Sequence, residues 1–342
     1  MNKCLFLASG LFLLAILVLN ALVGNLISAP LGVAVKATTG ARTLEAATAL
    51  HDALYEEQRK RALFEYSSEE RFNWHFIPRV RNGVSLPELN TDQRAKVSRL
   101  LVASLSEAGA SRAQQVMSLE ALLRDREGRN RRFARDPKLY YVSFFGQPSI
   151  KGKWGWRFEG HHLALNFTFD GAERLSSTPN FYGANPAKVL EGPKKGLRVL
   201  GPTEDLAREL VSSLDASQLE IARGEGEPEE VPGTQEARYK AVLPQGIPVE
   251  KLTVDQRKML RRLIRAYTEN LATDAEEALL QQIGAPALTG VQFVWRGGLG
   301  PGEGHSYMVH GPTFMINYAN FQNNASHIHA CLRNLKGEFG LD

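Results

Sequence analysis

The sequence predicts an α+β fold of two related units, each a helix pair followed by a β-hairpin, whose strands share one antiparallel sheet. Three observations support this prediction: a repeated helix-start motif, helical apolar spacing after each copy, and a strand, Gly-rich turn and longer strand after each helix pair. With 342 residues, 43% of them apolar, the chain can bury one large core or two smaller ones.

The first forty residues are typical of an export signal. Lys3 precedes an apolar run from Cys4 to Val23. Its length is compatible with a cleaved signal peptide within residues 1–37 and with an uncleaved anchor at residues 4–23. Both alternatives predict an exported protein, periplasmic or extracellular, that contacts a membrane only through this segment. Residues 38–342 are expected to form a single domain.

The repeated motif occupies residues 83–94 and 246–257, with identical Gly, Leu, Asp, Gln and Arg at matching positions. In each copy Asn90 or Thr253 is the expected N-cap, and the Gln three residues later completes a capping box. Apolar residues then recur at helical spacing, so each copy predicts a helix. A second helix is expected after each, near residues 112–125 and 274–283.

A strand and a longer strand should follow each helix pair. The expected strands lie at residues 140–145, 154–169, 291–296 and 305–318. These elements define pseudo-repeats at about residues 80–170 and 243–320. The segment that connects them, residues 171–242, should contain a helix near 203–222 and an exposed polar loop at 224–234.

Charge and cysteine content exclude several classes of protein. Lys and Arg number 41 against 37 Asp and Glu, a formal charge of +4, which is too small to indicate a nucleic-acid partner. The only cysteines are Cys4 and Cys331, so a disulfide scaffold and a C-x-x-C motif are excluded. The sequence also lacks G-x-S-x-G, H-E-x-x-H and P-loop motifs.

Six of the eight histidines fall in three short clusters on the later strands of the two units and just beyond them. Neutral imidazole is a common ligand for zinc, copper and iron, and a catalytic metal needs about three protein ligands. We therefore expect His161, His162, His327 and His329 to include metal ligands. Glu159 and His310 are the candidate catalytic residues.

Strand geometry limits which of these side chains can act together. His161 and His162 should point to opposite faces unless Gly160 introduces a bulge. His327, His329 and Cys331 would share one face in an extended segment, whereas a helix would point the two histidines about 200° apart. Good helix formers in residues 325–335 favour the helix.

Four further residues are candidates for contacts with a substrate. Asn320, Gln322 and Asn323 lie in a carboxamide-rich stretch beside the last histidines, where they could bind substrate, hold a hydrogen-bonded corner, or both. Trp156 could wall a pocket, although an aromatic residue in a strand is more often part of the core.

Several segments resemble an exported family known only as domain-of-unknown-function family thirty-five hundred. The resemblance rests on residues 140–146, 154–163, 309–312 and 322–329, which include Glu-Gly-His-His and His-Ile-His. It extends from about residue 45 to the C-terminus. The resemblance implies an exported single module and no particular reaction, and Cys331 does not belong to the family pattern.

The leading functional hypothesis is an exported metal-dependent enzyme, a hydrolase or an oxidoreductase, that holds zinc, copper or iron. Its substrate would be a small molecule or a component of the cell envelope. Two alternatives stay open. One is a non-catalytic binding or cell-envelope structural protein, in which the histidines form a buried hydrogen-bonded network. The other is a metal-free enzyme that uses a histidine and Glu159 as acid and base.

Overall fold

The described residues form one twelve-stranded, mostly antiparallel sheet together with helices, which confirms the α+β class. The computed structural model describes residues 38–128, 135–239, 244–284 and 287–341. The predicted export segment, residues 1–37, lies outside the described residues. Every helix of the described ranges is too short or too polar to span a bilayer.

The first half of the described chain runs from helices into strands and ends on β7. Its elements are α2 (Thr39–Ala53), α3 (Glu56–Ala62), β1 (Leu63–Phe64), η1 (Glu69–Phe72), β2 (Val84–Ser85), η2 (Leu86–Glu88), α4 (Thr91–Ser104), α5 (Glu107–Glu127), β3 (Tyr140–Phe145), β4 (Lys153–Gly160), β5 (Leu163–Asp170), β6 (Glu173–Ser176) and β7 (Asn180–Ala184).

The second half again places helices before strands. Its elements are α6 (Gly201–Ser212), α7 (Ala216–Ala222), β8 (Ile247–Pro248), η3 (Val249–Lys251), α8 (Val254–Thr268), α9 (Thr273–Gln282), β9 (Gln292–Gly297), β10 (His305–His310), β11 (Phe314–Phe321), α10 (Gln322–Ala325), β12 (His327–Asn334) and η4 (Glu338–Gly340).

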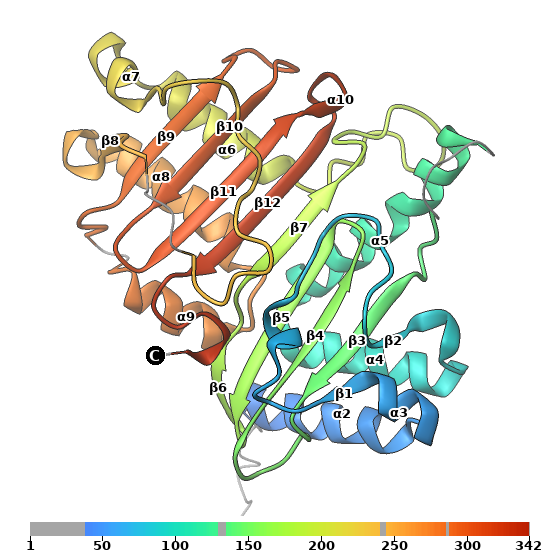
Figure 1. Cartoon of the computed structure of the whole chain (residues 1–342). Coiled ribbons are helices and arrows are strands. Elements are labelled where there is room, and N and C mark those ends of the chain that lie inside the picture. Colours follow the sequence, from blue (N-terminus) through green and yellow to red (C-terminus); the bar gives the residue numbers. More distant parts are fainter. Residues whose placement is uncertain (1–37, 129–134, 240–243, 285–286, 342) are drawn as a thin grey trace, which may run out of the picture. The chain divides into compact units, whose positions relative to one another are not determined.

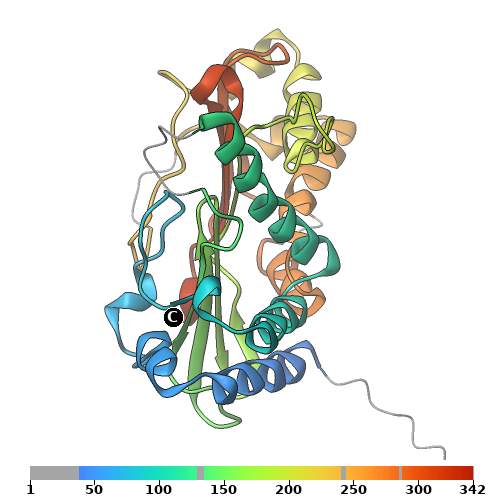
Figure 2. The same cartoon turned by 90° about the vertical axis from the view of Figure 1, so that its right-hand side faces the viewer.

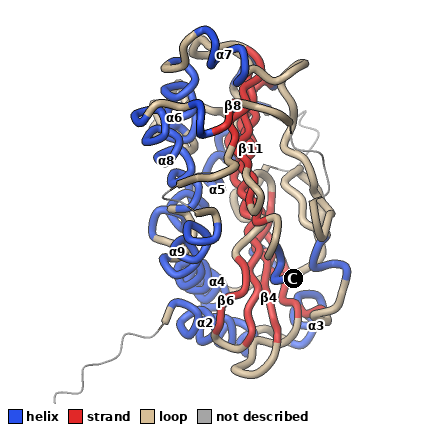
Figure 3. Tube along the Cα trace, turned by 90° about the vertical axis from the view of Figure 1, so that its left-hand side faces the viewer, coloured by secondary structure: helices blue, strands red, loops and turns tan. Residues whose placement is uncertain are grey.

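The strand order is β1-β3-β4-β5-β7-β12-β11-β10-β9-β8, so the two halves meet where β7 pairs with β12. Helices α2, α4, α5, α6, α8 and α9 cover one face of the sheet, as Figures 2 and 3 show from opposite sides. Two coil segments cross the other face (Figure 1). We name them the first strap (residues 72–82) and the second strap (residues 224–239).

Helices α4 and α8 begin with the two capping boxes that the sequence predicts. The glutamine of each capping box also forms hydrogen bonds with a second glutamine on another helix. Gln93 of α4 exchanges hydrogen bonds with Gln58 of α3, and Gln256 of α8 exchanges them with Gln218 of α7. Each capping glutamine therefore joins its helix to the short helix that precedes it.

Two predicted long strands are wrong, because the chain reverses direction within each. Residues 154–169 form the hairpin of β4 and β5, with His161 and His162 at its turn. Residues 305–318 likewise belong to β10 and β11, which form a hairpin. The single helix predicted at 203–222 is in fact two helices, α6 and α7. Residues 213–215 separate them, and Asp215 is the N-cap of α7.

The predicted helix at residues 325–335 is also wrong, since most of this segment is β12. Strand β12 is hydrogen-bonded to β11 on one side and to β7 on the other. Pairing along both edges outweighs the modest helix propensity of these residues. Asn323, Asn324 and Ala325 have φ values of 51–54°, which turn the chain from β11 into β12.

Candidate metal centre

The turn between β4 and β5 presents two successive histidine rings on the same side of the chain. His162 adopts the left-handed conformation, with φ 61°. Its N–H donates to Phe76 O of the first strap at 2.8 Å, and its carbonyl accepts from Gly183 N at 2.7 Å. The rings of His161 and His162 stack with centroids 3.7 Å apart. The expectation that the two rings point to opposite faces is therefore wrong, because the tight turn at His162, and not a bulge at Gly160, removes the strand alternation that would separate them.

Strand β12 supplies the other two histidines. His327 and His329 are two residues apart in an extended strand, so both side chains point to the same face, with ring centroids 4.6 Å apart. The N–H of His327 donates to Asn320 Oδ1 at 3.1 Å. Cys331 packs in an apolar cluster with Trp74, and burial raises the pKa of its thiol to about 12.

One group, which we call the histidine cluster, is formed by His161, His162, His327 and His329. It lies at the end of β12 nearest the β4–β5 turn. Strand β7 lies between β5 and β12 and brings them together. His162 Nε2 lies 2.7 Å from His327 Nε2. One ring nitrogen each from His162, His327 and His329 lies within 4.8 Å of the other two, as in a metal-binding group.

Two carboxylates orient the outer histidines. Glu230 of the second strap places Oε1 2.7 Å from His329 Nδ1. Gln322 Nε2 and Val231 N donate to the same carboxylate. Because a neutral imidazole that donates through Nδ1 keeps its lone pair on Nε2, Glu230 directs His329 Nε2 toward the cluster.

On the other side of the cluster, Glu120 of α5 lies 2.5 Å from His161 Nδ1. Together with His162, these two residues form a second group with metal-ligand spacing. Arg135 Nη1, however, lies 3.1 Å from the same Nδ1. A guanidinium at this position opposes a metal cation, which makes the group of His162, His327 and His329 the better metal site.

Burial favours the neutral form of His161, His162 and His327. It lowers the pKa of His162 well below the ordinary value, and the neighbouring histidines lower it further. Burial also lowers the pKa of His327 to about 3, with smaller effects from His329 and His161. The pKa of His161 is lowered by burial as well, although Glu120 opposes this shift. These three rings therefore present lone pairs, and the neutral ring is the form in which imidazole binds metals.

Sequence reasoning did not single out Glu120, Arg135 or Glu230. Glu120 could have been noticed, because it lies on the buried face of α5 beside Leu119 and Leu123. Nothing marked Glu230, which lies in the loop predicted to be exposed and polar. Its position follows from the second strap crossing β12.

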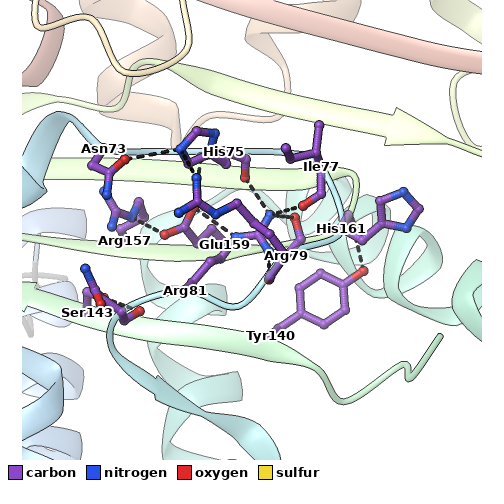
Figure 4. A network of polar contacts seen from close by, with 12 residues as sticks. Asn73, His75, Ile77, Arg79, Arg81, Tyr140, Ser143, Arg157, Glu159 and His161 are labelled. Atoms are coloured by element: carbon purple, nitrogen blue, oxygen red, sulfur yellow. Dashed lines mark hydrogen bonds and ion pairs between the residues drawn. The ribbon is translucent and has the colours of Figure 1, made fainter. Parts of the chain in front are cut away.

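The structure does not bring Glu159 into the histidine cluster. Its side chain is 1% exposed and lies between two arginines, Arg81 and Arg157, at 3.2 and 2.7 Å (Figure 4). The same carboxylate accepts a hydrogen bond from His75 N at 3.0 Å. Glu159 therefore lies in an ion-pair network beneath the first strap.

His310 also lies away from the cluster. It pairs with Met315 at the far end of β10, whereas His329 is opposite Ala319 nearer the other end of β11. His310 Nε2 lies 2.8 Å from Pro244 O. The hairpin reverses the chain after His310, and this separates it from the other predicted site residues.

The proposed substrate-contact residues lie in different environments. Asn320 is buried and holds His327 N, while Gln322 holds Glu230, so both support the cluster. Asn323 is exposed in the turn before β12. Trp156 is fully buried and stacks on Phe167 in the core.

Cavities in the described residues include three whose linings contain none of the four histidines of the cluster. One of about 370 Å³ lies beside β6 and α9, and one of about 420 Å³ lies beside β2 and the first strap. Another, of about 160 Å³, lies under the second strap and is lined in part by Glu230, the partner of His329.

Of the comparisons with known proteins, one identifies a family for this chain. No match was found among characterised proteins or solved structures. A model of the family described as Protein of unknown function (DUF3500) matches residues 36–341, nearly the whole chain, which confirms the resemblance seen in the sequence. The chain is therefore a member of the DUF3500 family of proteins of unknown function.

Proposed function

We propose that this chain is an exported metal-dependent enzyme, a hydrolase or an oxidoreductase, whose metal is held by His162, His327 and His329. The convergence of these three ring nitrogens within 4.8 Å of one another is the observation that carries the proposal. Three imidazoles leave a coordination position for water or substrate, as catalytic metal sites require.

The geometry fits a transition metal with a small adjustment. Two nitrogen ligands of tetrahedral zinc lie about 3.3 Å apart, so the 2.7 Å between His162 Nε2 and His327 Nε2 would have to widen slightly. His327 is the most exposed of the three proposed ligands, so water or substrate would reach a bound metal from its side. Zinc, copper and iron all accept such ligands, and the metal would supply Lewis-acid or redox chemistry.

Residues around the ligands support this role. Glu230 would keep the Nε2 lone pair of His329 directed at the metal, and Asn320 would hold the backbone of His327. Such outer contacts commonly orient metal-binding histidines. The substrate would be a small molecule or an envelope component that reaches the site from the side of His327.

A non-catalytic role is the competing proposal. Without a metal, the hydrogen bond between His162 and His327, together with the contacts of Glu120 and Glu230, gives every ring of the cluster a partner. A binding or structural protein of the cell envelope could use such a network. Metal content separates the two proposals.

Export remains part of the proposal and rests on the apolar run from Cys4 to Val23. Accessibility of a tag at residue 342 to protease in intact cells would test export.

We also propose that residues of about 80–170 and 243–320 are related units. The matching glutamine pairs at Gln93 and Gln256, and the pairing of β2 with β3 and of β8 with β9, support this relationship.

The decisive experiment for function measures metal in the full chain, produced with its export segment and purified without chelators. We expect about one zinc, copper or iron per chain, and loss of at least nine-tenths of it in the double variant His327→Ala/His329→Ala. His310→Ala, a histidine outside the cluster, should retain the metal. An unaltered chain without metal, which also takes up none when the three ions are supplied, would exclude a metal-dependent function.

A further inference from the structure

Arg81 of the first strap connects that strap to the β4–β5 turn. Its Nη2 donates to three carbonyl oxygens, those of His75, Ile77 and Gly160, at 2.7–2.9 Å (Figure 4). Its Nη1 donates to Arg79 O at 2.8 Å. One guanidinium therefore binds the strap to the residue that immediately precedes His161.

Glu159 keeps this guanidinium in place. Its Oε2 lies 3.2 Å from Arg81 Nε, and its Oε1 lies 2.7 Å from Arg157 Nε. Arg157 in turn pairs with Glu70 at 2.6 Å, so two cations face two anions. All four side chains are buried or nearly so, and removing one partner would leave an uncompensated buried charge.

The contacts of Arg81 bear directly on the conformation of His162. The N–H of His162 donates to Phe76 O, and Phe76 lies between His75 and Ile77, two of the strap residues whose carbonyls Arg81 binds. Tyr140 adds a second contact, because its hydroxyl donates to His161 O at 2.9 Å. A left-handed φ of 61° is unfavourable for histidine, so the turn depends on such contacts.

We propose that Arg81, with its counter-ion Glu159, and Tyr140 are positioning residues that hold the His161–His162 turn in its metal-binding conformation. This inference rests on the proposed function. It assigns Glu159 a role through Arg81 and the backbone, with no contact to metal or substrate. Bidentate and multiple contacts need the planar fork of arginine, so lysine is not an equivalent replacement.

The test compares Arg81→Lys and Glu159→Gln with Arg174→Lys in the full chain. Arg174 is a matched control: it is also a buried arginine in an ion pair, with Asp274, and it lies on β6 away from the cluster. Metal affinity is measured by competition with a chromophoric chelator, using Zn²⁺ and Co²⁺. We expect both site variants to lose affinity by about 10- to 100-fold and the control to lose less than about 2-fold.

Two further readouts separate positioning from a general loss of stability. The visible absorption of bound Co²⁺ should change in Arg81→Lys and stay the same in Arg174→Lys. In metal-free protein, hydrogen exchange of the His162 amide should accelerate in Arg81→Lys. If Arg81→Lys does not fold, Tyr140→Phe decides, since it removes only the hydroxyl bonded to His161 O and should still lower affinity.

The outcomes distinguish the two levels of the argument. If the unaltered chain binds metal, and Arg81→Lys and Glu159→Gln leave its metal affinity and Co²⁺ spectrum unchanged, the positioning role is overturned and the metal centre is not. Where Arg81→Lys does not fold, the same result in Tyr140→Phe leads to the same conclusion. An equal loss in Arg174→Lys would also overturn the positioning role, as a stability effect. An unaltered chain that binds no metal would overturn the proposed function and this inference with it.

Discussion

His162 and His327 are 165 positions apart in the chain, yet their Nε2 atoms lie 2.7 Å from each other. One residue comes from the β4–β5 turn and the other from the start of β12. Strand β7 lies between them in the sheet, and His329 completes a triangle of ring nitrogens. The candidate metal centre is therefore a product of the junction between the two halves of the sheet.

Glu230 should set the metal affinity of His329. We expect Glu230→Gln to weaken Zn²⁺ binding by about 10- to 100-fold, because the carboxylate that orients His329 is replaced by a weaker acceptor. Competition titration would measure the effect. Glu229→Gln is the control, because Glu229 pairs with Arg296 and not with a histidine of the cluster. Equal affinities in the two variants would remove Glu230 from the site.

The metal-free protein should lose stability as the pH falls from 6.5 to 5. Burial lowers the pKa of His327 to about 3 and that of His162 well below its ordinary value. These rings stay neutral in the folded state at pH 5, whereas the unfolded chain binds protons below about 6.5. Because the unfolded state then binds more protons, the stability that these groups contribute above pH 6.5 decreases on acidification.

For His327 this effect amounts to at most about 2 kcal/mol at pH 5, which is about 1.5 pH units below the pKa of an unfolded histidine, and His162 acts in the same direction. Glu338 has the opposite effect on stability, because burial raises its pKa to about 7 in the folded protein. Its carboxylate therefore binds a proton at a higher pH in the folded than in the unfolded chain, which adds stability as the pH falls. Urea unfolding at pH 7 and pH 5 should therefore be compared with the variant His162→Gln/His327→Gln. A pH dependence identical in both proteins would contradict the assignment of neutral buried rings.

Cys331 should take no part in metal binding, although it continues the alternation of His327 and His329. Its thiol is fully buried, and burial raises its pKa to about 12, so the thiolate that metals require does not form at neutral pH. We expect Cys331→Ala to retain its full metal content. Iodoacetamide should modify the native thiol only after unfolding. Loss of metal in Cys331→Ala would instead indicate that His327, His329 and Cys331 bind the metal together.

The two glutamine pairs should make similar contributions to stability. Gln93→Ala removes the side-chain donor to Ala53 O and both hydrogen bonds with Gln58. Gln256→Ala likewise removes the donor to Ser213 O and both hydrogen bonds with Gln218. We expect each variant to lower the free energy of unfolding by about 2 kcal/mol. Urea denaturation would measure this. Arg99→Ala, at an exposed position of α4, is the control. A loss no larger than that of the control would show that these pairs do not join the helices.

Local patterns predicted α4 and α8 well, because their N-caps, capping glutamines and apolar spacing all lie within a few residues of each other. The first strand of each unit was also placed correctly, at β3 and β9. Strand ends were harder to predict. The apolar residues on both sides of His161 and His162 read as one long strand, although the left-handed turn at His162 divides it.

The candidate site was predicted only in part, because residue type is local information and the positions of the side chains are not. The histidines could be chosen by residue type and clustering, and four of them do lie together. His310 and Glu159 could not be excluded from the sequence, because hairpin turns and ion pairs with Arg81 and Arg157 decide their positions. Glu120 and Glu230 come from a helix and a strap that meet the cluster only in the folded chain.

The sequence by itself determined the α+β class, the family, the starts of α4 and α8 and the histidines that form the candidate site, since each depends on residue identity or short-range spacing. Tertiary structure alone decided that residues 327–334 are a strand, that β7 joins the two halves, and which carboxylates face which imidazoles. Those outcomes arise from hydrogen bonding and burial between residues distant in the chain, such as Glu120 and His161, which are 41 positions apart, and Glu230 and His329, which are 99 positions apart. No local pattern encodes such contacts.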